Sequence, residues 1–388
     1  MTTTTDPPAP GVSAPERAAE DPPDRPRRLR RRELDDVMSV IGAAMGAVGF
    51  VWLIYERMLP LKGRLGFVVC WYIAFLALYA LIVGQRRGRV VVVDRVVSVA
   101  VHTAGFLVVG VLAVVIGFTA ERGWGAVRHV RFFTTDLSVT GPNDPLTKGG
   151  ILHGMVGTLE QIGIAITITV PLGIAAAVFL SEVGGRMARV VRTLVEAMTA
   201  IPSIVAGLFV YAGLIVTLGL GQSGMSAACA VSVMMLPIVI RASEVVLRLI
   251  PGGLREAALA LGAPRWRMVW SAVLPTARSG LATAVVLAMA RGLGETAPVL
   301  LTAGYTQNFN ADPFNGPQVP LPLVAFNLVR KPEPEAIARG FGAALALLAM
   351  VLVLFVTARV LGGRPPGELS RRQRRRSRAV PTTDSEQG

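Results

Sequence analysis

The sequence predicts an all-α polytopic membrane protein. Of its 388 residues, 52% are hydrophobic and only 16% are charged, and the mean hydropathy is +0.55, which excludes an ordinary soluble domain. A helix needs about 20 apolar residues to cross the hydrocarbon core of a bilayer. Eight segments meet or approach that length: Val37–Tyr55, Leu65–Val83, Val96–Ala120, Met155–Leu180, Val195–Leu220, Ser223–Val246, Gly280–Gly304 and Phe341–Leu361.

The order of these segments predicts four regions. Residues 1–33 are rich in Thr, Pro, Asp and Arg without apolar periodicity, which predicts a disordered cytoplasmic tail. Residues 34–90 form an expected transmembrane hairpin of two helices. Residues 91–362 form the main transmembrane domain with six helices, and residues 363–388 form a basic cytoplasmic tail.

The distribution of basic residues predicts the topology. With the N-terminus inside, 28 of the 39 Lys and Arg residues flank the helices on the cytoplasmic side. Because Lys and Arg collect on that side of a membrane, we expect both termini to be cytoplasmic. The run Arg371–Arg376 is then a topology determinant that contacts anionic membrane lipid. The net charge of +14 therefore does not indicate nucleic-acid binding.

The sequence offers little material for a metal or cofactor site. Its two cysteines lie in different predicted spans, and its three histidines are scattered, which excludes a disulfide framework and argues against a metal centre. No Gly-x-x-x-x-Gly-Lys-Ser/Thr sequence occurs, so the chain has no P-loop for ATP phosphates. We expect no catalytic residues, no bound cofactor and no ATPase activity of its own.

Two ionisable residues, Arg291 and Glu295, fall within the predicted span Gly280–Gly304. Each costs about 2.5–3.5 kcal/mol at the centre of a bilayer, and such residues usually mark a transport path. They are four residues apart and hence on one helical face. The pair is therefore a candidate substrate path, or alternatively a buried ion pair that only fixes helix packing. A second pair, Arg241 and Glu244, is interpreted either as an exit gate or as an ordinary interfacial ion pair.

The predicted cytoplasmic loop 252–276 has the pattern of two short helices. Gly262 ends the first helix and Pro264 begins the second. The second places its apolar residues at the i, i+3, i+4, i+7 spacing of one helical face. These residues are Trp266, Val269, Trp270 and Val273.

The spacing of this loop resembles the EAA loop of ABC importer permeases. The matching residues, which the resemblance makes ATPase-coupling residues, are Glu256, Ala257, Ala258, Gly262, Leu274 and Pro275. Ala272 departs from the family pattern, which usually has Ile there. The resemblance implies a type I ABC importer permease core over residues 91–362, with ATP and Mg used by a partner ATPase.

Four further stretches resemble the PstA-type permease of bacterial phosphate importers: Gly149–Thr158, Pro171–Ala177, Ile201–Gly207 and Ala290–Pro298. The resemblance implies import of inorganic phosphate together with a PstC-type permease, a PstB-type ATPase dimer and a PstS-type phosphate-binding protein. A guanidinium such as that of Arg291 suits a tetrahedral oxyanion. Two alternatives remain: transport of another oxyanion, sulfate or molybdate, and a phosphate-signalling scaffold that uses the N-terminal hairpin.

Overall fold

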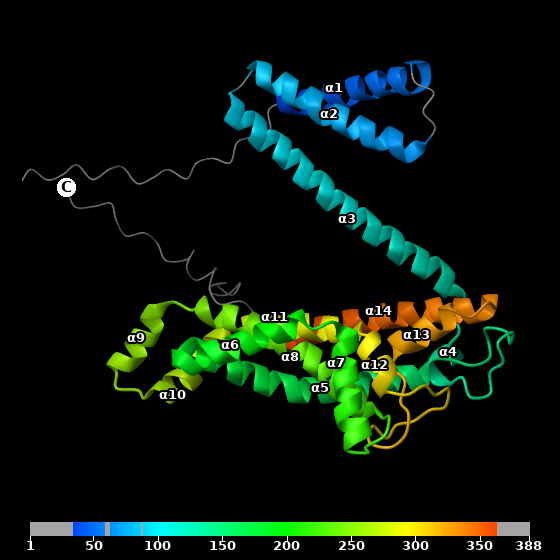
Figure 1. Ribbon diagram of the computed structural model, residues 1–388, viewed down its shortest axis with the longest axis vertical. Coiled ribbons are helices and arrows are strands. Elements are labelled where there is room, and N and C mark those ends of the chain that lie inside the picture. The colour runs from blue at the N-terminus through cyan, green and yellow to red at the C-terminus, as the bar shows by residue number, and fades with distance from the viewer. Residues whose placement is uncertain (1–33, 59–62, 87, 363–388) are drawn as a thin grey trace, which may run out of the picture. The chain divides into compact units, whose positions relative to one another are not determined.

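The structure, a computed structural model, describes residues 34–58, 63–86 and 88–362. Every element in these ranges is helical, which confirms the predicted fold class. The helices belong to two compact units, one within Met1–Val111 and one within Leu112–Gly388, and the boundary falls inside α3 (Arg89–Val127) (Figure 1). The tails predicted at residues 1–33 and 363–388 lie outside the described residues.

The first unit is the predicted hairpin. Helix α1 packs on α2 because small residues of α1, such as Ala43 and Ala47, recur every four positions and admit the aromatic rings of Phe75 and Tyr79. The indole N–H of Trp71 donates to a carbonyl of α1 at 3.2 Å. The elements of this unit are α1 (Leu34–Trp52), η1 (Leu53–Met58), α2 (Arg64–Arg86) and the first part of α3.

The second unit is a helical bundle built around α5 and α8. Gly173 of α5 lies so close to α8 that a Cβ there would come within 2.5 Å of the Val239 side chain, which shows how a glycine sets this contact. The described residues contain seven helices long and apolar enough to cross a membrane. The long helices of this unit are the second part of α3, α5 (Leu152–Val178), α8 (Gly224–Arg248), α11 (Leu274–Leu293) and α14 (Pro334–Gly362).

The predicted span Val195–Leu220 is wrong as a single helix. The chain forms α6 (Gly185–Ala200), then α7 (Ser203–Val210) continued by η3 (Tyr211–Thr217), and turns by 106° between them. The cause is Pro202, which disfavours helical geometry for the preceding residue. Ile201 accordingly adopts φ −70° and ψ 126°.

The predicted span Gly280–Gly304 is also interrupted. Helix α11 ends at Leu293, and a short helix α12 (Ala297–Thr302) follows. Pro298 cannot donate a hydrogen bond to the carbonyl of Gly294, and its ring would clash with that carbonyl in a continuous helix. The break places Glu295 outside the helix that was predicted to contain it.

Short helices and loops close the end of the second unit at which α12 lies. Two long loops lie at this end, one between α3 and α5 and one between α12 and α14. The first contains α4 (Arg131–Thr134), and the second contains α13 (Leu321–Val329), which packs on α14 and α5 (Figure 1). Side chains of α5 hold the segment before α13. Gln161 donates to the carbonyl of Gln318 at 2.7 Å, and the Leu321 N–H donates to Thr158 at 2.8 Å.

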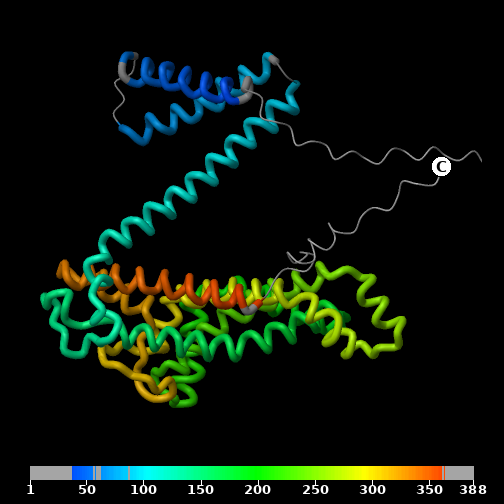
Figure 2. Tube along the Cα trace, turned by 180° about the vertical axis from the view of Figure 1, so that it is seen from behind, coloured from blue at the N-terminus to red at the C-terminus, as the bar shows by residue number. Residues whose placement is uncertain are grey.

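The opposite end of the second unit carries the predicted two-helix loop. Figure 2 shows this loop projecting from the bundle, far from α13. The turn between the two short helices requires Gly262, whose φ of +80° favours glycine. The elements at this end are η2 (Phe179–Val183), α9 (Gly252–Ala260), α10 (Arg265–Met268) and η4 (Val269–Val273).

Candidate functional site

The predicted pair of Arg291 and Glu295 forms at the break between α11 and α12. Arg291 is in the last turn of α11, and its Nε lies 3.5 Å from Oε1 of Glu295. The arginine side chain is 58% exposed, whereas the glutamate side chain is 12% exposed. The pair is therefore half-open, with the guanidinium mostly exposed and the carboxylate mostly buried.

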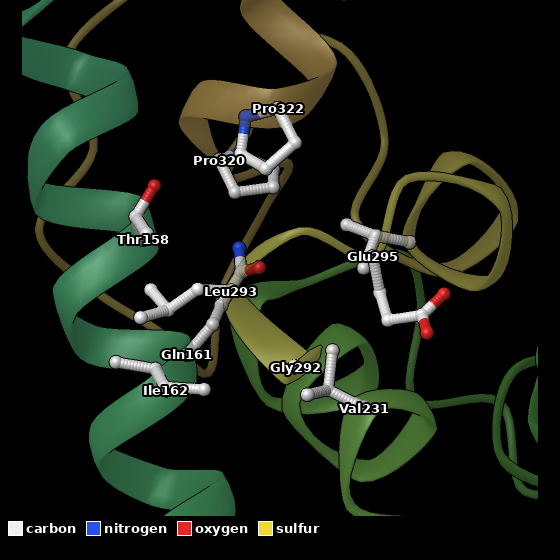
Figure 3. A pocket seen from close by; sticks show the side chains of 10 residues that line it. Thr158, Gln161, Ile162, Val231, Gly292, Leu293, Glu295, Pro320 and Pro322 are labelled. Atoms are coloured by element: carbon white, nitrogen blue, oxygen red, sulfur yellow. The ribbon is translucent and has the colours of Figure 1, made fainter. Parts of the chain in front are cut away.

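Glu295 borders a small cavity of about 20 Å³ on the α5 side of the break. Thr158 and Gln161 of α5 also line it, opposite two prolines that flank the start of α13 (Figure 3). Figure 3 shows the Glu295 carboxylate turned away from Thr158 and Gln161. A cavity of this size holds about one water molecule, so it is too small for an oxyanion.

Arg291 lines a different and larger cavity, of about 410 Å³. This volume lies within the usual range for small-molecule sites. The cavity forms where α6 ends, beside the proline-bearing turn of α8 and the last turns of α11. Its lining residues are Met198, Thr199, Met234, Pro237, Ile238, Leu287 and Arg291. Its walls are therefore mostly apolar, and one positively charged group reaches it.

The predicted pair of Arg241 and Glu244 is wrong. Arg241 instead contacts Glu196 of α6 at 3.0 Å. Glu244 is 4% exposed and accepts hydrogen bonds from Arg192 of α6 at 2.8 Å and Arg248 at 2.6 Å. The two residues are only three positions apart on α8, but α6 supplies a partner to each. They connect α6 to α8.

The two-helix loop presents the expected residues at the end of the bundle. Glu256, Ala257, Gly262 and Pro275 are exposed, whereas Ala258 and Leu274 pack at the edge of a buried cluster.

The predicted single apolar face of the second helix of this loop is split. Val269 and Val273 are buried, but Trp266 and Trp270 are 67% and 70% exposed. The valines hold the loop to the bundle, and the tryptophans lie at its surface.

Comparison with known proteins decides the family. A family model described as "Binding-protein-dependent transport system inner membrane component" matches residues 169–364, half of the chain. The chain belongs to this family. It is thus an integral inner-membrane component of a transport system that works with a binding protein, and its family places it beside an ATPase subunit.

Several relatives of this transport component carry one name. The Phosphate transport system permease protein PstA 1 of Mycobacterium tuberculosis (strain ATCC 25618 / H37Rv) is 42% identical over 62% of this chain and 78% of that protein. The PstA proteins of Mycobacterium leprae (strain TN) and Xylella fastidiosa (strain 9a5c) are 37% and 39% identical, over 66% and 56% of this chain and 84% and 76% of theirs. Among solved structures, an inward-facing MetNI methionine ABC transporter chain is 21% identical, over 55% of this chain and 91% of that chain, with a TM-score of 0.41.

The match to the binding-protein-dependent family contains both candidate sites. Residues 169–364 include the break at Arg291 and Glu295 and the whole two-helix loop. The hairpin formed by α1 and α2 lies outside the matched residues.

One residue of this transport component that sequence reasoning missed is Arg255, immediately before the Glu256-Ala257-Ala258 motif. Its guanidinium contacts Glu182, which is 73 residues earlier in the chain. The only signal in the sequence was a charged residue next to a motif. Because the partner comes from η2, pattern spacing within the loop cannot reveal the contact.

Proposed function

We propose that this chain is the PstA-type permease subunit of an ATP-driven importer of inorganic phosphate. The names of the relatives that are 37–42% identical support phosphate as the solute. The structural observation that carries the proposal is the exposed Arg291 guanidinium, which lines a cavity of about 410 Å³ at a helix break. Broken helices near the middle of the membrane commonly form the solute sites of transporters.

Arg291 has the chemistry that a phosphate path requires. Its guanidinium offers a planar fork of N–H donors that can bind two oxygens of an oxyanion at once. Glu295, at 3.5 Å, orients the arginine and offsets its charge when no anion is present. When phosphate arrives, it competes with the glutamate for the same donors. Binding is therefore weak enough for phosphate to leave the path.

The coupling role falls to the loop between α8 and α11. In the proposed complex, a PstB-type ATPase dimer uses ATP and Mg and contacts the exposed residues of this loop. A PstC-type permease completes the path, and a PstS-type protein delivers phosphate from outside. Both termini are cytoplasmic, which puts the two-helix loop on the side of the ATPase. This chain contributes contacts and a path, and the hydrolysis belongs to the ATPase.

Phosphate uptake by the complete complex tests this proposal. ATP-dependent uptake is measured in vesicles that hold wild type, Arg291→Gln, or the control Arg359→Gln, with assembly verified for each. Arg359 is also an exposed arginine of this unit, and it contacts Thr283 at 3.1 Å. We expect loss of uptake only for Arg291→Gln. Normal uptake by an assembled Arg291→Gln complex removes Arg291 from the path. Movement of sulfate or molybdate in place of phosphate by the wild type contradicts the assigned solute.

A further inference from the structure

Arg255 joins the helix that carries the coupling motif to two other helices. Its Nε and Nη2 donate to the Glu182 carboxylate, with distances of 2.9–3.2 Å. Its Nη1 donates to the carbonyl of Ile250 and its Nη2 to that of Leu247, both at 2.8 Å. Arg255 lies on α9, Glu182 on η2 at the end of α5, and the carbonyls at the end of α8. We call this set of contacts the Arg255 junction.

The Arg255 junction is well suited to carry force. The side chains of Arg255 and Glu182 are 21% and 9% exposed, so water competes little for their hydrogen bonds. A bidentate contact between arginine and a carboxylate fixes the relative orientation of the two side chains in addition to their distance. The carbonyl of Leu247 lies in the last turn of α8 and that of Ile250 just after the helix ends, and the Leu247 carbonyl also accepts backbone N–H groups there. Arg255 adds a charged donor to each carbonyl.

Helix α9 has little other attachment to the bundle. Within the part of the chain that the structure describes, no residue of α9 is buried. Ala258 packs against the buried cluster that contains Val269 and Val273. Leu254 and Leu259 are 38% and 43% exposed. By contrast, the second helix of the loop is anchored by Val269 and Val273. Apart from the three residues that join α8 to α9, the polar junction is therefore the main contact between α9 and the ends of α5 and α8.

Glu182 lies at the end of α5, just before two glycines that separate α5 from α6. Glu182 lies in η2, a π-helical turn, and such turns often occur at functional sites. The two residues that follow η2, Gly184 and Gly185, have φ of +68° and +84°. This pair uncouples the direction of α6 from that of α5, so a pull on Glu182 acts on α5 in the first instance.

We propose that Arg255 is a positioning residue that transmits displacement of α9 to the ends of α5 and α8. α8 lines the cavity at Arg291 with Met234, Pro237 and Ile238, so this transmission reaches the candidate path. The inference rests on the proposed function, because it assumes that a motor protein moves α9. Transmission then depends on one side chain that makes five hydrogen bonds to four oxygens, and not on the exposed motif residues beside it.

The test measures phosphate transported per ATP hydrolysed by the complete complex in proteoliposomes. The variants are Arg255→Lys, which keeps the charge but loses the fork, and Glu182→Gln, which keeps the shape but loses the charge. The matched control is Arg186→Gln, which removes an exposed arginine four residues from Glu182. We expect both junction variants to hydrolyse ATP while phosphate per ATP falls about fivefold or more, the lower end of usual coupling between sites. The control keeps the wild-type ratio.

The outcomes separate this inference from the proposed function. If the wild type transports phosphate and both junction variants keep its ratio, the Arg255 junction does not transmit movement. An equal fall of uptake and hydrolysis also overturns the inference, because it shows a damaged motor contact or a misfolded loop. If the wild type hydrolyses ATP without moving phosphate, the proposed function fails. The ratio is then measured with sulfate or molybdate, and it tests the junction in the same way.

Discussion

Gly207 of α7 lies directly against Pro298 of α12. A Cβ at Gly207 would come 2.5 Å from the Cα of Pro298 and 2.9 Å from its carbonyl oxygen. Each residue ends one of the sequence stretches that resembled a phosphate permease, Ile201–Gly207 and Ala290–Pro298. The two stretches therefore pack against each other. Helix α7 supports the segment between α11 and α12, in which Glu295 lies.

Substitution Gly207→Ala tests this contact. Because the neighbouring atoms belong to the backbone of Pro298, they cannot rotate away, and the added methyl must push α7 and α12 apart. Overpacking of this kind usually costs about 1–3 kcal/mol. We expect a lower thermal unfolding temperature in detergent and reduced uptake, because the break at Glu295 shifts.

The matched control for Gly207→Ala is Gly213→Ala. Gly213 lies in the continuation of the same helix, and a methyl group added there would have no atom within 4 Å. Equal loss of stability in both variants would show that helix flexibility, and not the contact with Pro298, determines the effect.

The arginine–glutamate contacts between α6 and α8 predict unequal effects for two substitutions. Glu244→Gln removes the charge that holds Arg192 and Arg248, and charge-assisted hydrogen bonds at a buried carboxylate are worth about 1.5–3 kcal/mol. Arg241→Gln breaks a pair whose side chains are 43% and 51% exposed, so it costs about 0–1 kcal/mol. Thermal unfolding compares the two. A larger loss for Arg241→Gln would contradict this ranking.

The membrane class and the two-helix loop could be predicted from the sequence because both depend on local patterns. Apolar run length identified the spans, and the spacing from Glu256 to Pro275 identified the loop. The breaks could not be predicted in this way. Pro171 and Pro237 lie inside continuous helices, whereas Pro202 and Pro298 accompany breaks, so the presence of a proline alone does not predict where a helix breaks.

The ion-pair partners of the charged residues likewise could not be predicted from the sequence. Spacing suggested that Arg241 pairs with Glu244, three residues later, but α6 provides Glu196 instead. The partner of Arg255 is 73 residues away. Helical spacing shows which residues can meet on one helix, and it contains no information about which other helix crosses that face.

A contact between the two long loops predicts a pH dependence. Asp136 accepts hydrogen bonds from the Ser138 side chain at 2.7 Å and from the Phe309 N–H at 2.9 Å. Partial burial raises the pKa of Asp136, but the hydrogen bonds from Ser138 and Phe309 outweigh it and hold the pKa below its usual value. The contact therefore stabilises the folded loops at pH above the unfolded value of about 3.9. This stability is lost as the pH falls through the folded pKa.

Hydrogen exchange at the Phe309 amide measures this effect. We expect slow exchange at pH 7 in the wild type and faster exchange in Asp136→Asn, whose amide is a weaker acceptor and carries no charge. Asp312→Asn serves as the control, because Asp312 accepts hydrogen bonds from the Phe314 N–H and the Asn315 side chain within its own loop. If only Asp312→Asn accelerates exchange at Phe309, the link between the loops is not what protects that amide.

The exposed tryptophans of the two-helix loop predict weaker binding of the ATPase subunit, without loss of permease stability, when one of them is removed. Trp266 and Trp270 are four residues apart on one helical face and are 67% and 70% exposed. Tryptophans dominate the binding energy of many interfaces, and truncating one at a hot spot costs about 2 kcal/mol or more. We expect Trp270→Ala to leave thermal unfolding of the isolated permease unchanged but to weaken its binding to the ATPase subunit. Trp124→Ala, which removes a tryptophan that is 63% exposed on α3, should leave both unchanged. Equal weakening by the two substitutions would show that loss of an exposed tryptophan anywhere disturbs assembly, and would remove the two-helix loop as the binding surface.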